Sequence, residues 1–257
     1  MSSPSLIDRL RGGQRINALW QQGASELMTE MAARVGFDTL VIDNEHGPAS
    51  IGETLRLVRA AQGAGAQTIV RAGSHARDVL SRTLDTGTDG LLVPMVNTAA
   101  EARAVVDVCR YAPLGNRGVA ANVVRASGYG TEPGYLGRAN VQTLLAVQIE
   151  SATAIDNLDA ILAVPGIDML FIGPGDLSAS MGFIGQPATP AVVARIEQAR
   201  QKILAAGRLL GSVPRPDIDA RGLFALGCNL VVDGSDISLL RGALQKKLAE
   251  SRASLAA

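Results

Sequence analysis

Two acidic residues, Glu150 and Asp176, each follow a short apolar run, at residues 144–149 and 169–172. Both runs are predicted to be buried strands, with a helix between them. In a parallel strand–helix–strand unit both strands point the same way, so the two carboxylates emerge at the same edge of the sheet. Two carboxylates beside a glycine-rich turn suit a hard divalent cation that keeps positions open for water and substrate. Either acid alone would serve equally well as a helix cap, but the pair predicts a metal site.

Further polar side chains stand near the ends of these and other apolar runs: Asp43, His46, Arg71, Gln148, Ser178 and Ser212. His46 is one of only two histidines, and Asp43 in the same turn is placed to orient its imidazole as a general base. The guanidinium of Arg71 suits a carboxylate or a developing enolate oxygen beside a cation. For each residue the alternative is structural, a loop hydrogen bond for His46 and a rim ion pair for Arg71.

Lysine is absent from every predicted strand end, since it occurs only as Lys202, Lys246 and Lys247 in two predicted helices. A barrel lysine that forms an imine is a common way to stabilise an enamine. Without such a lysine, chemistry on a carbanion next to a carbonyl requires a metal as the electron sink.

Eight short apolar runs alternate with helix-forming stretches along the chain. The runs are at residues 16–20, 39–42, 68–70, 90–93, 144–149, 169–172, 209–213 and 230–232. Strands that are apolar throughout are covered on both faces, which is typical of a parallel sheet wrapped in helices. Eight repeats favour a closed (β/α)8 TIM barrel of the α/β class. The one long irregular segment is 112–137, and no linker divides the chain, so we predict a single domain over residues 1–257.

The bulk composition excludes several classes of function. Formal net charge is +0, so no basic field indicates nucleic acid or an anionic membrane. No apolar run approaches the ~20 residues of a membrane span, and the first residues lack a signal-peptide core. Cys109 and Cys228 are predicted to be buried thiols in a reducing compartment. We expect a cytoplasmic protein.

Several motifs together resemble the metal-dependent (class II) pyruvate aldolases, the hydroxy-oxo-heptanedioate aldolase group of the HpcH/HpaI aldolase and citrate lyase family. They are VIDNEHGP at 41–48, VR at 70–71, LLVPM at 91–95, GNRG at 115–118, VQIE at 147–150 and FIGPGDLS at 171–178. The resemblance covers nearly the whole chain. The sequence departs from the family pattern at Asn44, where glycine is more usual, and at 72–75, where a proline and an aromatic residue usually follow the arginine.

The resemblance implies a (β/α)8 barrel that assembles as a hexamer or trimer and exchanges its terminal helix between subunits. It implies that Glu150 and Asp176 bind Mg²⁺, Mn²⁺ or Co²⁺ and that Asp43 and His46 assist proton transfer. Asp85 would reach a neighbouring subunit's site. The remaining predicted substrate contacts are Arg71, Gln148, Gly173, Pro174, Ser178 and Ser212.

The predicted activity is reversible cleavage of 4-hydroxy-2-oxo acids to pyruvate, or hydroxypyruvate, and an aldehyde through a metal-stabilised enolate. An acyl-CoA lyase of the malyl-CoA type stays open, because arginines at 117, 125 and 138 could meet CoA phosphates. Oxaloacetate decarboxylation would use the same enolate site. A non-catalytic barrel that binds a metabolite is the alternative from another class, because fold alone does not establish activity.

Overall fold

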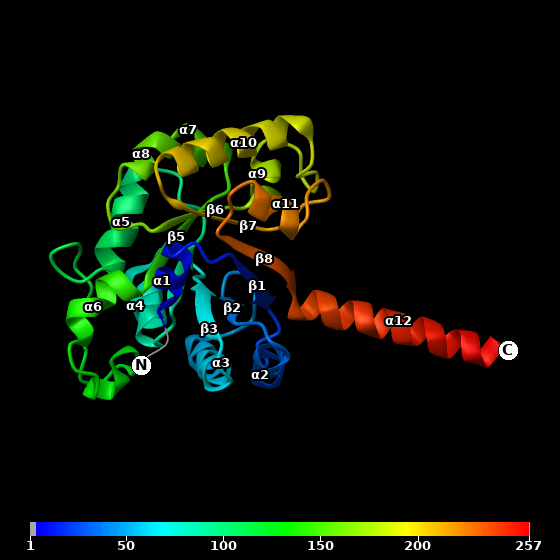
Figure 1. Cartoon of the computed structure of the whole chain (residues 1–257), viewed down its shortest axis with the longest axis horizontal. Coiled ribbons are helices and arrows are strands. Elements are labelled where there is room, and N and C mark those ends of the chain that lie inside the picture. Colours follow the sequence, from blue (N-terminus) through cyan, green and yellow to red (C-terminus); the bar gives the residue numbers. More distant parts are fainter. Residues whose placement is uncertain (1–3, 257) are drawn as a thin grey trace.

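Eight parallel strands close into a barrel in which each strand pairs with the next and β8 pairs with β1 (Figure 1). The computed structural model of the chain describes residues 4–256. The strands are Ile16–Gln21 (β1), Thr39–Asp43 (β2), Gln67–Arg71 (β3), Gly90–Val93 (β4), Leu144–Ile149 (β5), Met169–Ile172 (β6), Leu209–Ser212 (β7) and Leu230–Ser235 (β8). The predicted single-domain (β/α)8 barrel is confirmed.

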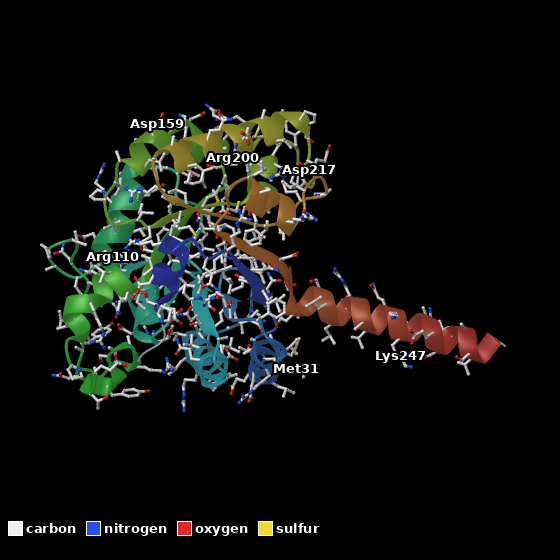
Figure 2. All side chains as sticks on the ribbon, viewed as in Figure 1. Met31, Arg110, Asp159, Arg200, Asp217 and Lys247 are labelled. Carbon is white, nitrogen blue, oxygen red and sulfur yellow. The ribbon has the colours of Figure 1, made fainter. Side chains whose placement is uncertain are left out.

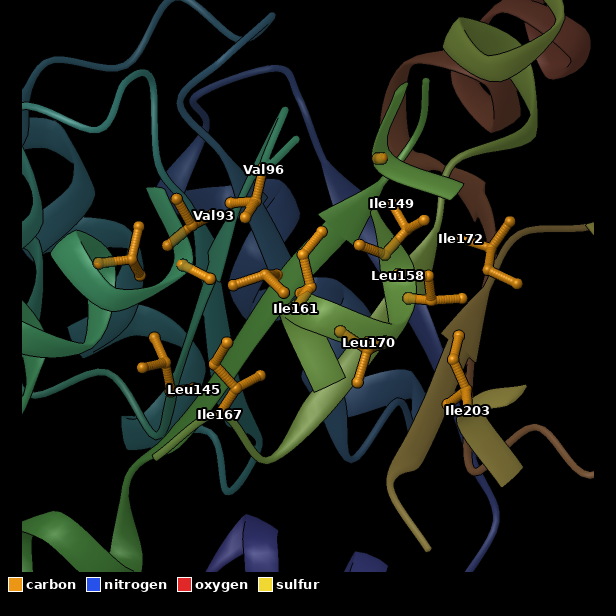
Figure 3. Close-up of a cluster of buried hydrophobic side chains, with 14 of the residues drawn as sticks. Val93, Val96, Leu145, Ile149, Leu158, Ile161, Ile167, Leu170, Ile172 and Ile203 are labelled. Carbon is orange, nitrogen blue, oxygen red and sulfur yellow. The ribbon is translucent and has the colours of Figure 1, made fainter. Parts of the chain in front are cut away.

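The strands are apolar throughout because each has a core on both faces. In β5, Leu144 and Ala146 point into the barrel, where they join Phe171 and other inward residues. Leu145 and Ile149 of β5 point outward and pack with helix residues, as Figure 3 shows for Leu158, Ile161 and Ile203. Alternate residues therefore fill two separate cores, and the strand ends alone are left for polar side chains.

Helices wrap the barrel and close one end of it. They are Leu6–Arg11 (α1), Glu26–Val35 (α2), Ile51–Gly63 (α3), Arg77–Asp85 (α4), Ala99–Cys109 (α5), Tyr135–Gln142 (α6), Ala152–Asp156 (α7), Leu158–Leu162 (α8), Pro174–Ser180 (α9), Pro190–Ala205 (α10), Ala220–Ala225 (α11) and Asp236–Ala256 (α12). The apolar side of α1 packs into the inner core at the N-terminal end of the strands, opposite the rim that carries the candidate site.

Three local expectations differ from the structure. The single helix predicted between the strands at 144–149 and 169–172 is broken at Asn157, whose side chain donates to the carbonyl oxygen of Asn97. The segment 112–137 is not wholly irregular, because a 3-10 helix occupies Arg125–Gly130 and α6 begins at Tyr135. The turn before Asp176 begins α9, since Pro174 is already set to the backbone angle of a first helical residue.

The last helix, α12, projects from the barrel rather than lying against it, and its side chains stand clear of the other helices (Figures 1 and 2). Ile237, Leu240, Leu244 and Leu248 form an exposed apolar face at helical spacing. No helix within residues 4–256 combines the length and the apolar character that crossing a membrane requires.

Candidate metal and substrate site

Glu150 is a carboxylate held in a fixed position just beyond β5, and it is only 2% exposed. Its Oε1 accepts a hydrogen bond from the Met95 backbone N–H at 2.6 Å, and its Oε2 accepts one from Gln148 Nε2 at 2.6 Å. Burial raises the pKa of Glu150 to about 7, and the Met95 hydrogen bond offsets only part of that effect. The charged form of the side chain therefore lacks water and would be stabilised by a nearby positive charge.

Two more carboxylates, Glu45 and Asp176, face Glu150 closely enough for their charges to raise its pKa further. Asp176 lies in the first turn of α9 and is exposed, whereas the Glu45 side chain is 20% exposed. Burial raises the pKa of Glu45, and the positive charges of Arg71 and His46 act against that rise. Three carboxyl groups thus lie near a single guanidinium, that of Arg71.

The donor set fits a hard cation. Carboxylate oxygens are the ligands that Mg²⁺ and Mn²⁺ prefer. Within residues 4–256, no group of three or more His, Cys, Asp and Glu side chains is arranged as a metal cage. Glu150 and Asp176 are the two carboxylates predicted as ligands, and water and substrate would fill the other positions, as is usual for Mg²⁺. The side-chain oxygen Oε1 of Gln148 is buried beside them without a hydrogen-bond partner.

Gly173 leaves room for the Glu150 carboxylate because it has no side chain. A Cβ at this position would lie 2.5 Å from Glu150 Oε2 and 2.8 Å from Glu150 Cβ. Neither distance is compatible with ordinary packing, so any larger residue would displace the carboxylate. The adjacent Pro174 is buried and begins α9, which carries Asp176. The predicted glycine-rich turn therefore helps to position both Glu150 and Asp176.

Arg71 is clamped by two acids and an aromatic ring. Its Nε and Nη2 donate to the two oxygens of Asp43 at 2.9 and 2.6 Å, and its Nη1 lies 2.9 Å from Glu45 Oε2. The guanidinium carbon is 4.5 Å from the centre of the Trp20 ring. Burial acts to raise the pKa of Asp43, but the hydrogen bonds and charge of Arg71 outweigh it and hold that pKa below its usual range. Arg71 is therefore a fixed cation that faces the acids.

The expected pairing of Asp43 with the His46 imidazole is wrong. Asp43 accepts hydrogen bonds from the backbone N–H groups of Glu45 and His46, at 3.0 and 3.2 Å. It also accepts side-chain hydrogen bonds from Arg71 and Gln22. The reason is register: Asp43 lies directly across from Arg71 on the neighbouring strand. The His46 ring is 61% exposed, and the carboxylate it faces is Glu45, at 3.9 Å.

Three predicted site residues lie in other settings. The Ser178 hydroxyl donates to the Gly175 carbonyl at 2.7 Å, and the Ser212 hydroxyl donates to the Ile172 carbonyl at 3.0 Å. Both hydroxyls therefore brace the rim backbone. Asp85 ends α4 and pairs with Arg117 at 2.8 Å, so within one chain it is not joined to the other site residues.

Sequence reasoning missed three residues that complete the site: Trp20, Glu45 and Met95. The signal for Glu45 was its position between Asp43 and His46 in one motif. Trp20 stands near the end of β1 and is the only tryptophan of the chain. Met95 contributes a backbone N–H, which carries no sequence signal.

A closed parallel barrel with two carboxylates and a clamped arginine at the C-terminal ends of its strands has the architecture of the barrel enzymes, whose active sites lie at that face. The sequence profile of the HpcH/HpaI aldolase/citrate lyase family matches residues 17–243, and the chain belongs to that family. The resemblance stated from the motifs is thus confirmed, as is the prediction of a carbon–carbon lyase.

Individual relatives agree with this assignment. The chain is 42% identical over 249 residues to a 2-keto-3-deoxy-L-rhamnonate aldolase of Klebsiella pneumoniae, covering 97% of this chain and 93% of that protein. It is also 42% identical to a hydroxypyruvate/pyruvate aldolase of Cupriavidus necator, covering 91% of this chain and 87% of that one. The crystal structure of a family member from Burkholderia cenocepacia superposes with a TM-score of 0.91 at 33% identity, covering 97% of this chain and 100% of that one.

Proposed function

We propose that the protein is a class II aldolase that reversibly cleaves 4-hydroxy-2-oxo acids to pyruvate, or hydroxypyruvate, and an aldehyde. The observation that carries the proposal is the buried Glu150 carboxylate, held by two hydrogen bonds next to Asp176 and opposite Arg71. Both aldolase relatives support it. The substrates are small keto acids and aldehydes.

Glu150 and Asp176 would hold the divalent cation, which we propose to be Mg²⁺, Mn²⁺ or Co²⁺. When bound, the cation supplies Lewis acidity at the carboxylate and keto oxygen of the keto acid. Glu150 brings its oxygens preorganised, because the Met95 N–H and Gln148 fix their direction. The Oε1 atom of Gln148 is buried without a hydrogen-bond partner, and a substrate hydroxyl or a water would supply one.

Arg71 would stabilise negative charge as it grows on the keto oxygen. Its Nε donates to Asp43, whereas Nη1 and Nη2 each carry a second proton beyond the one that points to Glu45 or to Asp43. The ion pair with Asp43 keeps the guanidinium from turning, so its donors need no reorganisation during the reaction. Substrate would share these donors with Glu45.

His46 would move the proton of the 4-hydroxyl during cleavage. Its ring is exposed to solvent, and the carboxylate nearest to it is that of Glu45, at 3.9 Å. Asp43 acts on this step only through Arg71 and through the backbone of the 43–46 turn. Ser178 and Ser212 brace the rim and, on this proposal, do not bind the reacting atoms.

The test is an aldol assay with purified protein. Pyruvate or hydroxypyruvate is incubated with Mg²⁺, Mn²⁺ or Co²⁺ and a panel of aldehydes, and products are identified by mass. We expect 4-hydroxy-2-oxo acids with at least one aldehyde, loss of product in EDTA, and recovery on adding metal. Oxaloacetate and malyl-CoA belong in the same panel, and turnover of either one without any aldol product would contradict the proposal.

We also propose that the protein is a homo-oligomer in which α12 of one copy covers the barrel of another. The apolar face of α12 is exposed to solvent. One side of α2 is exposed as well, at Leu27, Met31 and Val35. Light scattering should give a mass that is a multiple of one chain. Leu244→Glu should reduce that mass, whereas Lys246→Glu, on the opposite side of the same helix, should not. A cytoplasmic location stays a prediction.

A further inference from the structure

One peptide group connects His75 to the candidate metal ligand Glu150. The carbonyl oxygen of Pro94 receives a hydrogen bond from His75 Nε2 at 2.5 Å. The N–H of the same peptide belongs to Met95 and donates to Glu150 Oε1 at 2.6 Å. A carbonyl oxygen can only accept, so Nε2 carries the proton. The connection therefore runs from the imidazole through a single peptide plane to the carboxylate.

Strand pairing does not fix this peptide. The β4–β5 ladder ends at the pair of Val93 with Val147, one residue before Pro94. Met95 then adopts a φ of 52°, in the left-handed region that residues other than glycine rarely occupy. Such a conformation persists only where surrounding contacts hold it. The His75 bond is one such contact, and it acts on the peptide that faces Glu150.

We propose that His75 is a positioning residue for the metal site, acting on Glu150 through the Pro94–Met95 peptide. Its bond fixes the direction of the Met95 N–H and polarises the peptide, which strengthens the N–H to carboxylate bond. His75 stands in the loop that joins β3 to α4. The inference rests on the proposed function, because it takes Glu150 as a metal ligand.

The loop around His75 offers matched variants. His75→Gln keeps an N–H donor at about the position of Nε2, whereas His75→Asn is polar but too short to reach Pro94. His75→Leu removes the donor and keeps an apolar volume. Ser74→Ala is the control, because it removes a side chain of the same loop that bonds only to the Ala76 N–H.

The readout is the dissociation constant of Mn²⁺, measured from the electron paramagnetic resonance signal of free Mn²⁺ without substrate. Removing an outer partner of a metal ligand typically weakens affinity by ~10–100-fold. We expect losses in that range for His75→Asn and His75→Leu, and values within about threefold of wild type for His75→Gln and Ser74→Ala. The metal concentration for half-maximal activation should rise by the same factor.

Wild-type affinity in His75→Asn would overturn the inference, and so would an equal loss in His75→Asn and His75→Gln. His75→Asn is a small polar change at a half-exposed rim position, so it gives an answer even if His75→Leu fails to fold. Glu150→Gln separates this inference from the proposed function. If Glu150→Gln abolishes Mn²⁺ binding and His75→Asn does not weaken it, Glu150 is a metal ligand and His75 does not position it.

Discussion

Arg71 lies directly across from Asp43 on the neighbouring strand, and the two side chains form a two-point ion pair with contacts of 2.9 and 2.6 Å. Both are almost fully buried. A buried charge without its partner is strongly unfavourable, so the pair is stable only as a unit. The arrangement converts a flexible arginine into a fixed donor aimed at the acids of the rim.

Substitutions at Arg71 separate charge from geometry. Arg71→Lys keeps the positive charge but loses the planar fork, and Arg71→Ala loses both. Loss of one preorganised donor typically costs ~10²–10³ in rate, about 3–4 kcal/mol. We expect kcat for pyruvate proton exchange to fall in the order wild type, Lys, Ala. Wild-type exchange in Arg71→Ala with reduced aldol activity would instead make Arg71 an aldehyde-positioning residue.

Gly173 and Gly175 are matched for a test of the carboxylate's position. A Cβ on Gly173 would lie 2.5 Å from Glu150 Oε2, whereas a Cβ on Gly175 meets nothing within 4 Å. Gly173→Ala should therefore displace Glu150 and weaken Mn²⁺ binding at least tenfold, about 1.4 kcal/mol. Gly175→Ala should bind as wild type does. Equal affinities in the two variants would show that the tight contact does not set the metal site.

The pH dependence of stability follows from Glu150. Burial raises its pKa in the folded protein to about 7, from 4.5. The folded state therefore holds an extra proton between these values, and the free energy of unfolding falls as pH rises through that window. The full shift corresponds to about 3 kcal/mol at ~1.4 kcal/mol per pKa unit.

The measurement is urea unfolding in EDTA from pH 4.5 to 8, with Glu150→Gln as the reference. Wild type should lose stability relative to Glu150→Gln as pH rises, and adding Mg²⁺ at pH 8 should restore it to wild type only, because a ligand stabilises the state that binds it. Parallel curves for the two proteins would mean that Glu150 titrates near its ordinary pKa.

The barrel was predictable because every strand is buried on both faces and must therefore be apolar throughout. Residues such as Leu144 and Leu145 enter opposite cores, and both must be apolar. The break at Asn157 was not predictable, because it depends on a bond to Asn97, 60 residues away. Short-range patterns determine which segments are strands and helices, whereas distant partners determine where a helix stops.

The same distinction explains the site. The proximity of Glu150 and Asp176 was predictable, because each follows an apolar run and one crossover joins the two strands. Asp43 was assigned to His46 because the two are three residues apart, but the cross-strand neighbour Arg71 forms the stronger, two-point pair. Pairing across a sheet depends on register, which the sequence of one strand does not contain.

The most direct test of the account is the exchange of pyruvate methyl protons with deuterium, followed by proton NMR without any aldehyde. This exchange reports enolate formation alone. With Mg²⁺, wild type should exchange the protons, whereas EDTA, Glu150→Gln and Asp176→Asn should each lower the rate at least ~10²-fold, the scale of losing one preorganised electrostatic group. Exchange at the wild-type rate in EDTA, or in either variant at saturating Mg²⁺, would contradict the metal-dependent mechanism.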